Sequence, residues 1–158
     1  MNFDPEPDSH GVNSRLADYL CAQRESIIGE WLGRVRGDPD IPTDSLSTPE
    51  LKDHVPWIFD DLADTLRGYG TATSGQTDRD SAIHAGVRWR QGYRLSDVLR
   101  ELKHLRTNLI YRLRAFEELN ADFVGVARLF ALEILHRFLD DVAISAADQY
   151  LRELRTSG

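Results

Sequence analysis

The C-terminal third of the chain constrains the fold most, because nothing in it interrupts a helix. No Gly or Pro lies between Gly125 and Gly158, and apolar residues recur there at steps of three and four. This spacing predicts one helix from a capping Asn120 to about Leu154. This helix is much longer than the average in globular proteins, and its part from Phe123 to Leu139 is expected to pack along other helices of the same chain. We therefore expect the chain to fold as a helical bundle.

The same periodicity predicts four shorter helices before it. The second of them starts at Thr48-Pro49-Glu50, where a capping hydroxyl is followed by Pro and by an acid in the first turn. Pro56 is expected to kink or restart that helix, because it lacks an amide donor. Small polar residues make 71–76 a predicted loop. The four predicted helices cover residues 14–35, 48–67, 78–91 and 96–118.

The expected fold class is all-α: a single bundle of about five helices with a long C-terminal helix, and with a globin-like arrangement as one option. A length of 158 residues suits one domain with a sizeable core. We predict a disordered tail over residues 1–13, which are rich in Pro and Asp. The folded domain is then expected to span residues 14–158.

A heptad-like row of side chains in the long helix indicates pairing with a second copy. The row steps by fours and threes through Leu135, Leu139, Val142 and Ala146. An exposed apolar seam of several turns is unfavourable in water. We therefore predict that residues 140–158 project as a signalling or dimerisation helix, and that the protein is a homodimer.

A single glycine joins the third and fourth predicted helices, and a row of polar side chains precedes it. His84, Arg88 and Gln91 are spaced i, i+4 and i+7, so they lie along one side of a helix. An apolar stripe runs beside this row, so the row borders a buried face. Gly92 ends the helix and is expected to have a positive φ.

The stretch around this glycine resembles the N-terminal domain of the RsbT co-antagonist (RsbRD-type) proteins of the bacterial stressosome, which is also found ahead of many soluble sensor histidine kinases. That family has a His, an Arg four positions later, a Gln-Gly-aromatic turn, and a Glu and a Leu-Arg pair on the next helix. The Asp-His-hydrophobic-Pro run of residues 53–56 is also similar to the family. The matching residues are His84, Arg88, Gln91, Gly92, Tyr93, Glu101, Leu105 and Arg106.

The resemblance implies a non-enzymatic helical input domain that senses stress or another signal, or that scaffolds an assembly. It also implies an output partner, either a kinase or an anti-sigma-factor antagonist, in the same chain or in another. The alternative is a haem-binding, globin-like gas sensor, because an all-helical chain of this length can hold haem and His104 or His136 could serve it. We expect no cofactor, with haem as the one exception that stays open.

Two roles are open for the polar row. In the first, Glu101 accepts hydrogen bonds from Arg88 or His84 and forms a structural clasp, in which charge-assisted bonds contribute roughly 1.5–3 kcal/mol each. In the second, the same groups converge on a small anionic ligand. The clasp is favoured, because a carboxylate already lies within reach of the basic groups. The candidate residues for either role are His84, Arg88, Gln91, Gly92, Glu101 and Arg106.

No catalytic or metal-binding pattern occurs in the sequence. It contains no Gly-x-Ser-x-Gly elbow, Walker loop or Rossmann fingerprint, and its five His form no zinc pattern. Neither His84 nor His104 is followed by the acidic residue that follows the phosphoacceptor His of kinases. We predict that the chain is not an enzyme and holds no metal.

Charge and hydropathy argue against two kinds of partner. The net charge is −7, and basic residues are concentrated between Arg88 and Arg114. We expect these residues to pair within the chain, with Asp60–Asp64 as the candidate partner, or to form a solvated face, rather than to bind nucleic acid. No apolar run is long enough to cross a bilayer, and the N-terminus lacks the features of a signal peptide. We therefore expect a cytoplasmic protein with no membrane partner.

Overall fold

The computed structural model describes the backbone of residues 7–68 and 70–157, and the side chains of residues 11–68 and 77–157. The described residues form helices and contain no strand, so the all-α prediction is confirmed. These residues form seven helical segments rather than about five, because two of the predicted helices are each divided. The segments are α1 (Pro7–Ala22), α2 (Arg24–Gly37), α3 (Thr48–Lys52), α4 (Val55–Leu66), α5 (Gly70–Arg90), α6 (Leu95–Leu119) and α7 (Gly125–Thr156).

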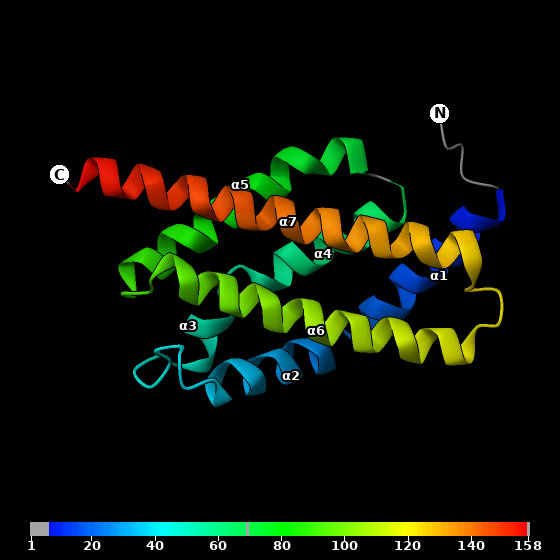
Figure 1. Cartoon of the computed structure of the whole chain (residues 1–158), viewed down its shortest axis with the longest axis horizontal. Coiled ribbons are helices and arrows are strands. Elements are labelled where there is room, and N and C mark those ends of the chain that lie inside the picture. Colours follow the sequence, from blue (N-terminus) through cyan, green and yellow to red (C-terminus); the bar gives the residue numbers. More distant parts are fainter. Residues whose placement is uncertain (1–6, 69, 158) are drawn as a thin grey trace.

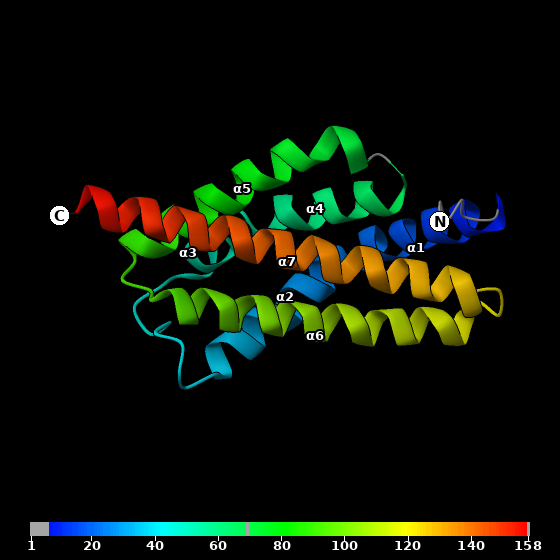
Figure 2. The same cartoon turned by 45° about the horizontal axis from the view of Figure 1, so that its top comes forward.

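The helices pack around the two longest of them, α6 and α7, which run antiparallel along the long axis of the molecule (Figure 1). Figure 2 shows α4 and most of α5 on one side of α7 and α6 on the other. α5 packs along α7 and against α4, while α2 packs on α6. The largest fully buried side chains include Trp31, Phe59 and Phe123, and also one charged residue, Arg88. An arginine at the centre of a core needs partners for its charge.

The first helix starts earlier than predicted and is divided. Residues 7–13, which we predicted to be part of a disordered tail, belong to α1, and residues 1–6 lie outside the described residues. Val12 is buried one turn before Leu16, so the apolar face of the helix extends beyond the predicted start. Gln23 separates α1 from α2, where we predicted one continuous helix.

The helix predicted from Thr48 restarts near Pro56, as expected. Ser47, rather than Thr48, caps α3 through a reciprocal capping box with Glu50. Asp53 follows α3 with a φ of 41° and turns the chain. Pro56 then lies in the first turn of α4, where its missing N–H removes no helical bond.

Two further predicted boundaries were wrong. α5 begins at Gly70, so residues 71–76, which we predicted to be a loop, are helical, and no Pro prevents this. Asn120 is the C-cap of α6 and not the N-cap of α7, which begins at Gly125. The side-chain amide of Asn120 donates to the carbonyl of Phe116 at 3.0 Å and so closes the last turn of α6.

The predicted dimer seam is buried inside the bundle. Leu135, Leu139, Val142 and Ala146 are each at most 2 % exposed. α7 packs against α1, α4, α5 and α6, and it stays packed as far as the buried Tyr150. The prediction that this row pairs with a second copy is therefore wrong, because the row already packs against its own chain. Residues 140–150 do not project from the bundle.

Candidate functional site

A charged cluster lies in the core where α3, α5 and α6 meet, and we call it the clasp. It consists of Asp53, His84, Arg88 and Glu101. Asp53 follows α3, His84 and Arg88 lie one turn apart on α5, and Glu101 lies in the second turn of α6. The side chains of His84, Arg88 and Glu101 are 4 %, 0 % and 1 % exposed. The polar row that the helical spacing predicted therefore faces the core.

His84 bridges the two carboxylates of the clasp. Its Nδ1 donates to Asp53 Oδ2 at 2.9 Å, and its Nε2 donates to Glu101 Oε2 at 3.3 Å. Because an ionised carboxylate only accepts hydrogen bonds, both ring nitrogens carry a proton and the ring is a cation. Burial lowers the pKa of His84, but the bonds to Asp53 and Glu101 outweigh it, so the pKa lies above its usual value.

Asp53 stays ionised despite its burial. Burial alone would raise the pKa of Asp53, but hydrogen bonds from His84 and His54 lower it to about 2. The bond from His54 Nδ1 to Asp53 Oδ1 measures 2.8 Å. The clasp thus contains two carboxylates and two cations, so its charges balance.

Arg88 ties α3 to both α5 and α6. Its Nε donates to Glu101 Oε2 at 3.0 Å. Its Nη1 donates to the carbonyl of Glu50 at 3.1 Å and to Gln91 Oε1 at 2.7 Å, and its Nη2 donates to the carbonyl of Leu51 at 2.5 Å. Carbonyls in the last turn of a helix have no partner within it, so Arg88 also satisfies the end of α3.

Two buried polar atoms beside the clasp have no hydrogen bond, namely Glu101 Oε1 and the hydroxyl of Tyr93. The guanidinium carbon of Arg88 lies 5.0 Å from the centroid of the Tyr93 ring, in cation–π geometry. Burial and the negative charge of Glu101 raise the pKa of Tyr93 above its usual value. The Tyr93 hydroxyl therefore stays protonated and has a hydrogen to donate, while Glu101 Oε1 has a free lone pair to accept one.

Residues 91–94 form the turn that joins α5 to α6, and we call this turn the elbow. The clasp lies next to it. Gly92 has a φ of 83°, the positive value that we predicted, and the N–H of Tyr93 bonds the carbonyl of Arg88 at 3.0 Å. The hydroxyl of Tyr150 on α7 donates to the carbonyl of Tyr93 at 3.0 Å. The Tyr150 ring also packs edge-on against Trp89, with a centroid distance of 5.3 Å. These two contacts attach α7 to the elbow.

Arg106 is not part of the clasp, although we grouped it with the other five candidate residues. Its Nη1 donates to His136 Nδ1 at 2.8 Å, and its Nη2 donates to Asp140 Oδ1 at 2.7 Å. Five positions separate Arg106 from Glu101, which is a rotation of about 140° around a helix. This rotation turns Arg106 away from the clasp and toward α7.

Five of the eight basic residues between Arg88 and Arg114 form ion pairs within the chain, but not with the acidic segment that we predicted. Asp60 of that segment accepts a bond at 2.8 Å from Arg24 of α2, which lies outside the basic stretch. Arg112 of the stretch pairs with Glu30 of α2 at 2.5 Å. Further pairs join Arg94 and Arg100 to Asp97, and Arg106 to Asp140.

The two His considered as haem ligands have polar partners. His104 Nε2 lies 2.7 Å from Asp38 Oδ2, and His136 Nδ1 accepts the bond from Arg106. An axial haem ligand needs instead a His that faces a pocket for the macrocycle. Among the described residues, no three His, Cys, Asp or Glu side chains are grouped as a metal site.

Sequence reasoning missed Asp53 and Tyr150 as site residues. A signal existed for Asp53, since the run of residues 53–56 is similar to the family, but it indicated no contact with His84. Tyr150 gave no signal, because its partner is a backbone carbonyl 57 residues away. Sequence reasoning also missed Trp31, whose indole N–H donates to the carbonyl of Glu101 at 2.9 Å.

The geometry of the clasp fits a structural role better than a ligand site. Its charges are compensated by one another, and the side chains of His84, Arg88 and Glu101 are buried, while that of Asp53 is 13 % exposed. A small anion would have to displace Glu101 from Arg88 to enter. Such a buried and compensated network ties helices together and depends on every member.

Comparison with known proteins identifies the family. The profile of the family described as the RsbT co-antagonist protein rsbRD N-terminal domain matches residues 25–158, which include the clasp, the elbow and α7. No curated protein and no solved structure matches the chain. No helix in the described part of the chain is long and apolar enough to cross a membrane. The chain belongs to the family of RsbT co-antagonist protein rsbRD N-terminal domains.

Proposed function

We propose that this chain is a non-enzymatic input domain of a cytoplasmic signalling system. In this proposal a stimulus that acts on the bundle alters the clasp, and α7 passes the change to an output partner. The partner is either a kinase or an anti-sigma-factor antagonist. Membership of a family of N-terminal domains of RsbT co-antagonists supports a regulatory role of this kind.

The observation that carries the proposal is the hydrogen bond between Tyr150 and the elbow. The Tyr93 carbonyl that accepts this bond follows Gly92 directly, and the Tyr93 ring stacks on Arg88 of the clasp. A change in the clasp therefore reaches α7 through contacts between neighbouring groups. Beyond Tyr150, α7 continues to Thr156, so its last turns are in a position to pass a displacement on.

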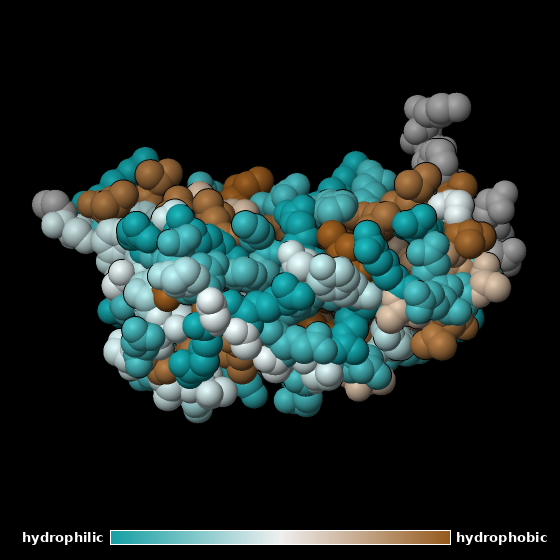
Figure 3. Space-filling view, turned by 60° about the horizontal axis from the view of Figure 1, so that its bottom comes forward, coloured by the Kyte–Doolittle hydropathy of each residue, from teal (hydrophilic) through white to brown (hydrophobic). Residues whose placement is uncertain are grey.

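We also propose that the signalling form is a homodimer, joined on the face of α7 opposite to the one that we predicted. Ile144, Ala147, Leu151 and Leu154 step by three, four and three, as a and d positions of a heptad do, and we call them the outer seam. Ile144, Leu151 and Leu154 are 60 %, 51 % and 57 % exposed. Hydrophobic residues lie beside the C-terminal end of the chain in Figure 3. Pairing with a second copy would remove this row from water.

A chimeric kinase tests the proposed function. The chain is fused after Ser157 to the transmitter part of a soluble histidine kinase, so that α7 continues into its dimerisation helix. Tyr150→Phe removes only the hydroxyl that bonds the elbow, and Tyr111→Phe is the matched change at an exposed position on α6. We expect autophosphorylation to change several-fold in Tyr150→Phe and to stay unchanged in Tyr111→Phe. Equal activity of both variants and the parent chimera would contradict the proposal.

A further inference from the structure

Two buried carboxyl groups meet between α4 and α5, apart from the clasp. Asp61 lies in the middle of α4 and Asp80 lies on α5, and the two residues are only 8 % and 5 % exposed. A buried charge is unfavourable unless it is compensated, and a second charge of the same sign beside it adds repulsion. The proposed function makes no use of this pair.

The surroundings of Asp61 favour its neutral form. Its Oδ2 is buried and has no hydrogen-bond partner among the described residues. Burial and the carboxyl group of Asp80, with which Asp61 shares a hydrogen bond, raise the pKa of Asp61 from 3.8 to about 7, although a bond from the Thr77 hydroxyl lowers it. The negative charge of Asp64 on the same helix raises it further. Since an ionised carboxylate only accepts, a hydrogen bond between two carboxyl groups needs one proton.

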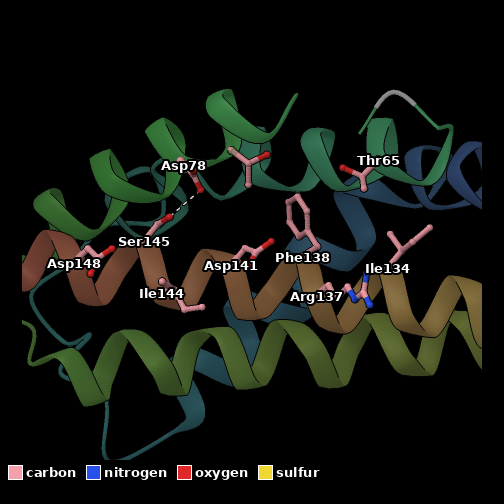
Figure 4. Close-up of a pocket in the computed structure, with 10 residues that line it drawn as sticks. Thr65, Asp78, Ile134, Arg137, Phe138, Asp141, Ile144, Ser145 and Asp148 are labelled. Carbon is pink, nitrogen blue, oxygen red and sulfur yellow. Dashed lines mark hydrogen bonds between the residues drawn. The ribbon is translucent and has the colours of Figure 1, made fainter. Parts of the chain in front are cut away.

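The cations on the helices around α4 are engaged by other carboxylates, and none in the described part of the chain forms an ion pair with Asp61. On α7, Arg137 and Asp141 lie across from Thr65 of α4 (Figure 4), and Asp141 adds only negative charge. On α5, His84 is bound within the clasp. The nearby arginines pair as follows: Arg24 of α2 with Asp60, Arg67 with Asp18 of α1, and Arg137 with Glu133.

A route for a proton leads from this pair to solvent. A hollow of about 400 Å³ lies between α4 and α5, and Trp57, Asp60, Asp61 and Asp80 line it. Trp57 is 54 % exposed, so the hollow opens to water. A proton therefore reaches Asp61 or leaves it while the protein stays folded.

We propose that Asp61 is a proton-binding site that makes the packing of α4 on α5 sensitive to pH. Below neutral pH, Asp61 is neutral and donates its hydrogen bond to Asp80. As the pH rises, Asp61 releases the proton to water in the hollow, and the two carboxylates then repel each other across the two helices. His84 lies one turn after Asp80 on α5, so a shift of α5 reaches the clasp. The proton-binding step does not depend on the proposed function, but its use as a stimulus does.

NMR of the whole chain with ¹³C-labelled Asp tests the inference, because each carboxyl carbon reports its own protonation and not that of His84. We expect one Asp carboxyl resonance to titrate near pH 7 in the wild type and to be missing from Asp61→Asn. Asp80→Asn should lower the midpoint of this resonance by about one pH unit or more, since a neighbouring negative charge is removed. Asp44→Asn, at an exposed position before α3, should leave it unchanged.

Urea unfolding at about pH 5 and about pH 8 tests the effect on packing. The folded-state pKa of Asp61 is raised, so the stabilisation from its proton is present below about pH 4 and is lost as the pH rises toward 7. Asp61→Asn is neutral at both pH values, so its urea midpoint should rise relative to the wild type between pH 5 and pH 8. The inference is overturned if every Asp carboxyl titrates below about pH 5, or if the midpoints of Asp61→Asn and the wild type differ equally at both pH values.

Discussion

Replacing Glu101 with Gln removes the charge on which the clasp is centred. The change keeps the shape of the side chain but removes the anion that accepts from His84 Nε2 at 3.3 Å and from Arg88 Nε at 3.0 Å. Arg88 is fully buried, and its other partners are two backbone carbonyls and one side-chain amide, all of them neutral. Removing one member of a buried ion pair costs about 3–5 kcal/mol. The amide oxygen of Gln can still accept one bond, so we expect the free energy of unfolding to fall by about 3 kcal/mol.

A double-mutant cycle measures how much of this loss belongs to the pair. Urea unfolding of the wild type, Arg88→Gln, Glu101→Gln and the double variant, followed by tryptophan fluorescence and circular dichroism, gives the coupling energy. We expect about 1.5–3 kcal/mol, as for other charge-assisted bonds. Glu118→Gln, the same change at an exposed position, should stay within about 0.5 kcal/mol of the wild type. A coupling near zero, with single variants as stable as the wild type, would refute the clasp and favour a ligand site.

Four further predictions concern the clasp, the elbow and the outer seam. The pKa of His84 is raised above 6.5, so its stabilisation is present below about pH 6.5 and is lost as the pH rises through the folded-state value; the urea midpoint should fall as the pH rises above about 6.5 in the wild type but not in His84→Gln. The pKa of Asp53 is about 2 instead of 3.8, so its stabilisation is present above about pH 4 and is lost as the pH falls toward 2. Gly92→Ala should lower the free energy of unfolding by about 1 kcal/mol through backbone strain, because φ is 83° and no atom lies within 4 Å of the added methyl group; an unchanged urea midpoint would contradict this. Leu151→Lys should convert a dimer into a monomer in light scattering at tens of micromolar, whereas Leu129→Lys, outside the outer seam, should not, and a monomeric wild type would exclude the dimer.

The elements that could be predicted from the sequence are those with local determinants. Gly92 ends α5 because the turn needs a positive φ, and the long α7 follows from the absence of Gly and Pro. The division at Gln23 has no such cause, because no residue there breaks a helix. It accompanies tertiary contacts, such as the ion pair of Arg24 with Asp60 of α4. Contacts of this kind override local propensity and do not show in the spacing.

The candidate site likewise contains residues that local spacing could group and residues that only tertiary contacts bring together. His84 and Arg88 meet Glu101 across one elbow, 17 and 13 residues away, so helical spacing was enough to group them. Asp53 lies 31 residues from His84, and its contact depends on how α3 packs. We assigned the heptad-like row that begins at Leu135 to a dimer interface. Spacing shows that one face of a helix is covered, but it does not show which helices cover it. The covering helices belong to the same chain.

If a change in the clasp alters the last turns of α7, a distance between α5 and α7 changes with it. Spin labels are attached to cysteines that replace Ile83 on α5 and Leu154 on α7, both of them exposed. Cys21, the one native thiol, is replaced by Ala so that it takes no label. Pulsed electron paramagnetic resonance then gives the distribution of distances, with and without Glu101→Gln.

A second label pair, at Tyr111 on α6 and Leu129 on α7, serves as the control away from the clasp. We expect Glu101→Gln to shift or broaden the distances between positions 83 and 154 and to leave the control distances unchanged. If the variant loses stability as expected but the distances between positions 83 and 154 stay the same, the clasp is only a structural support and does not communicate with α7.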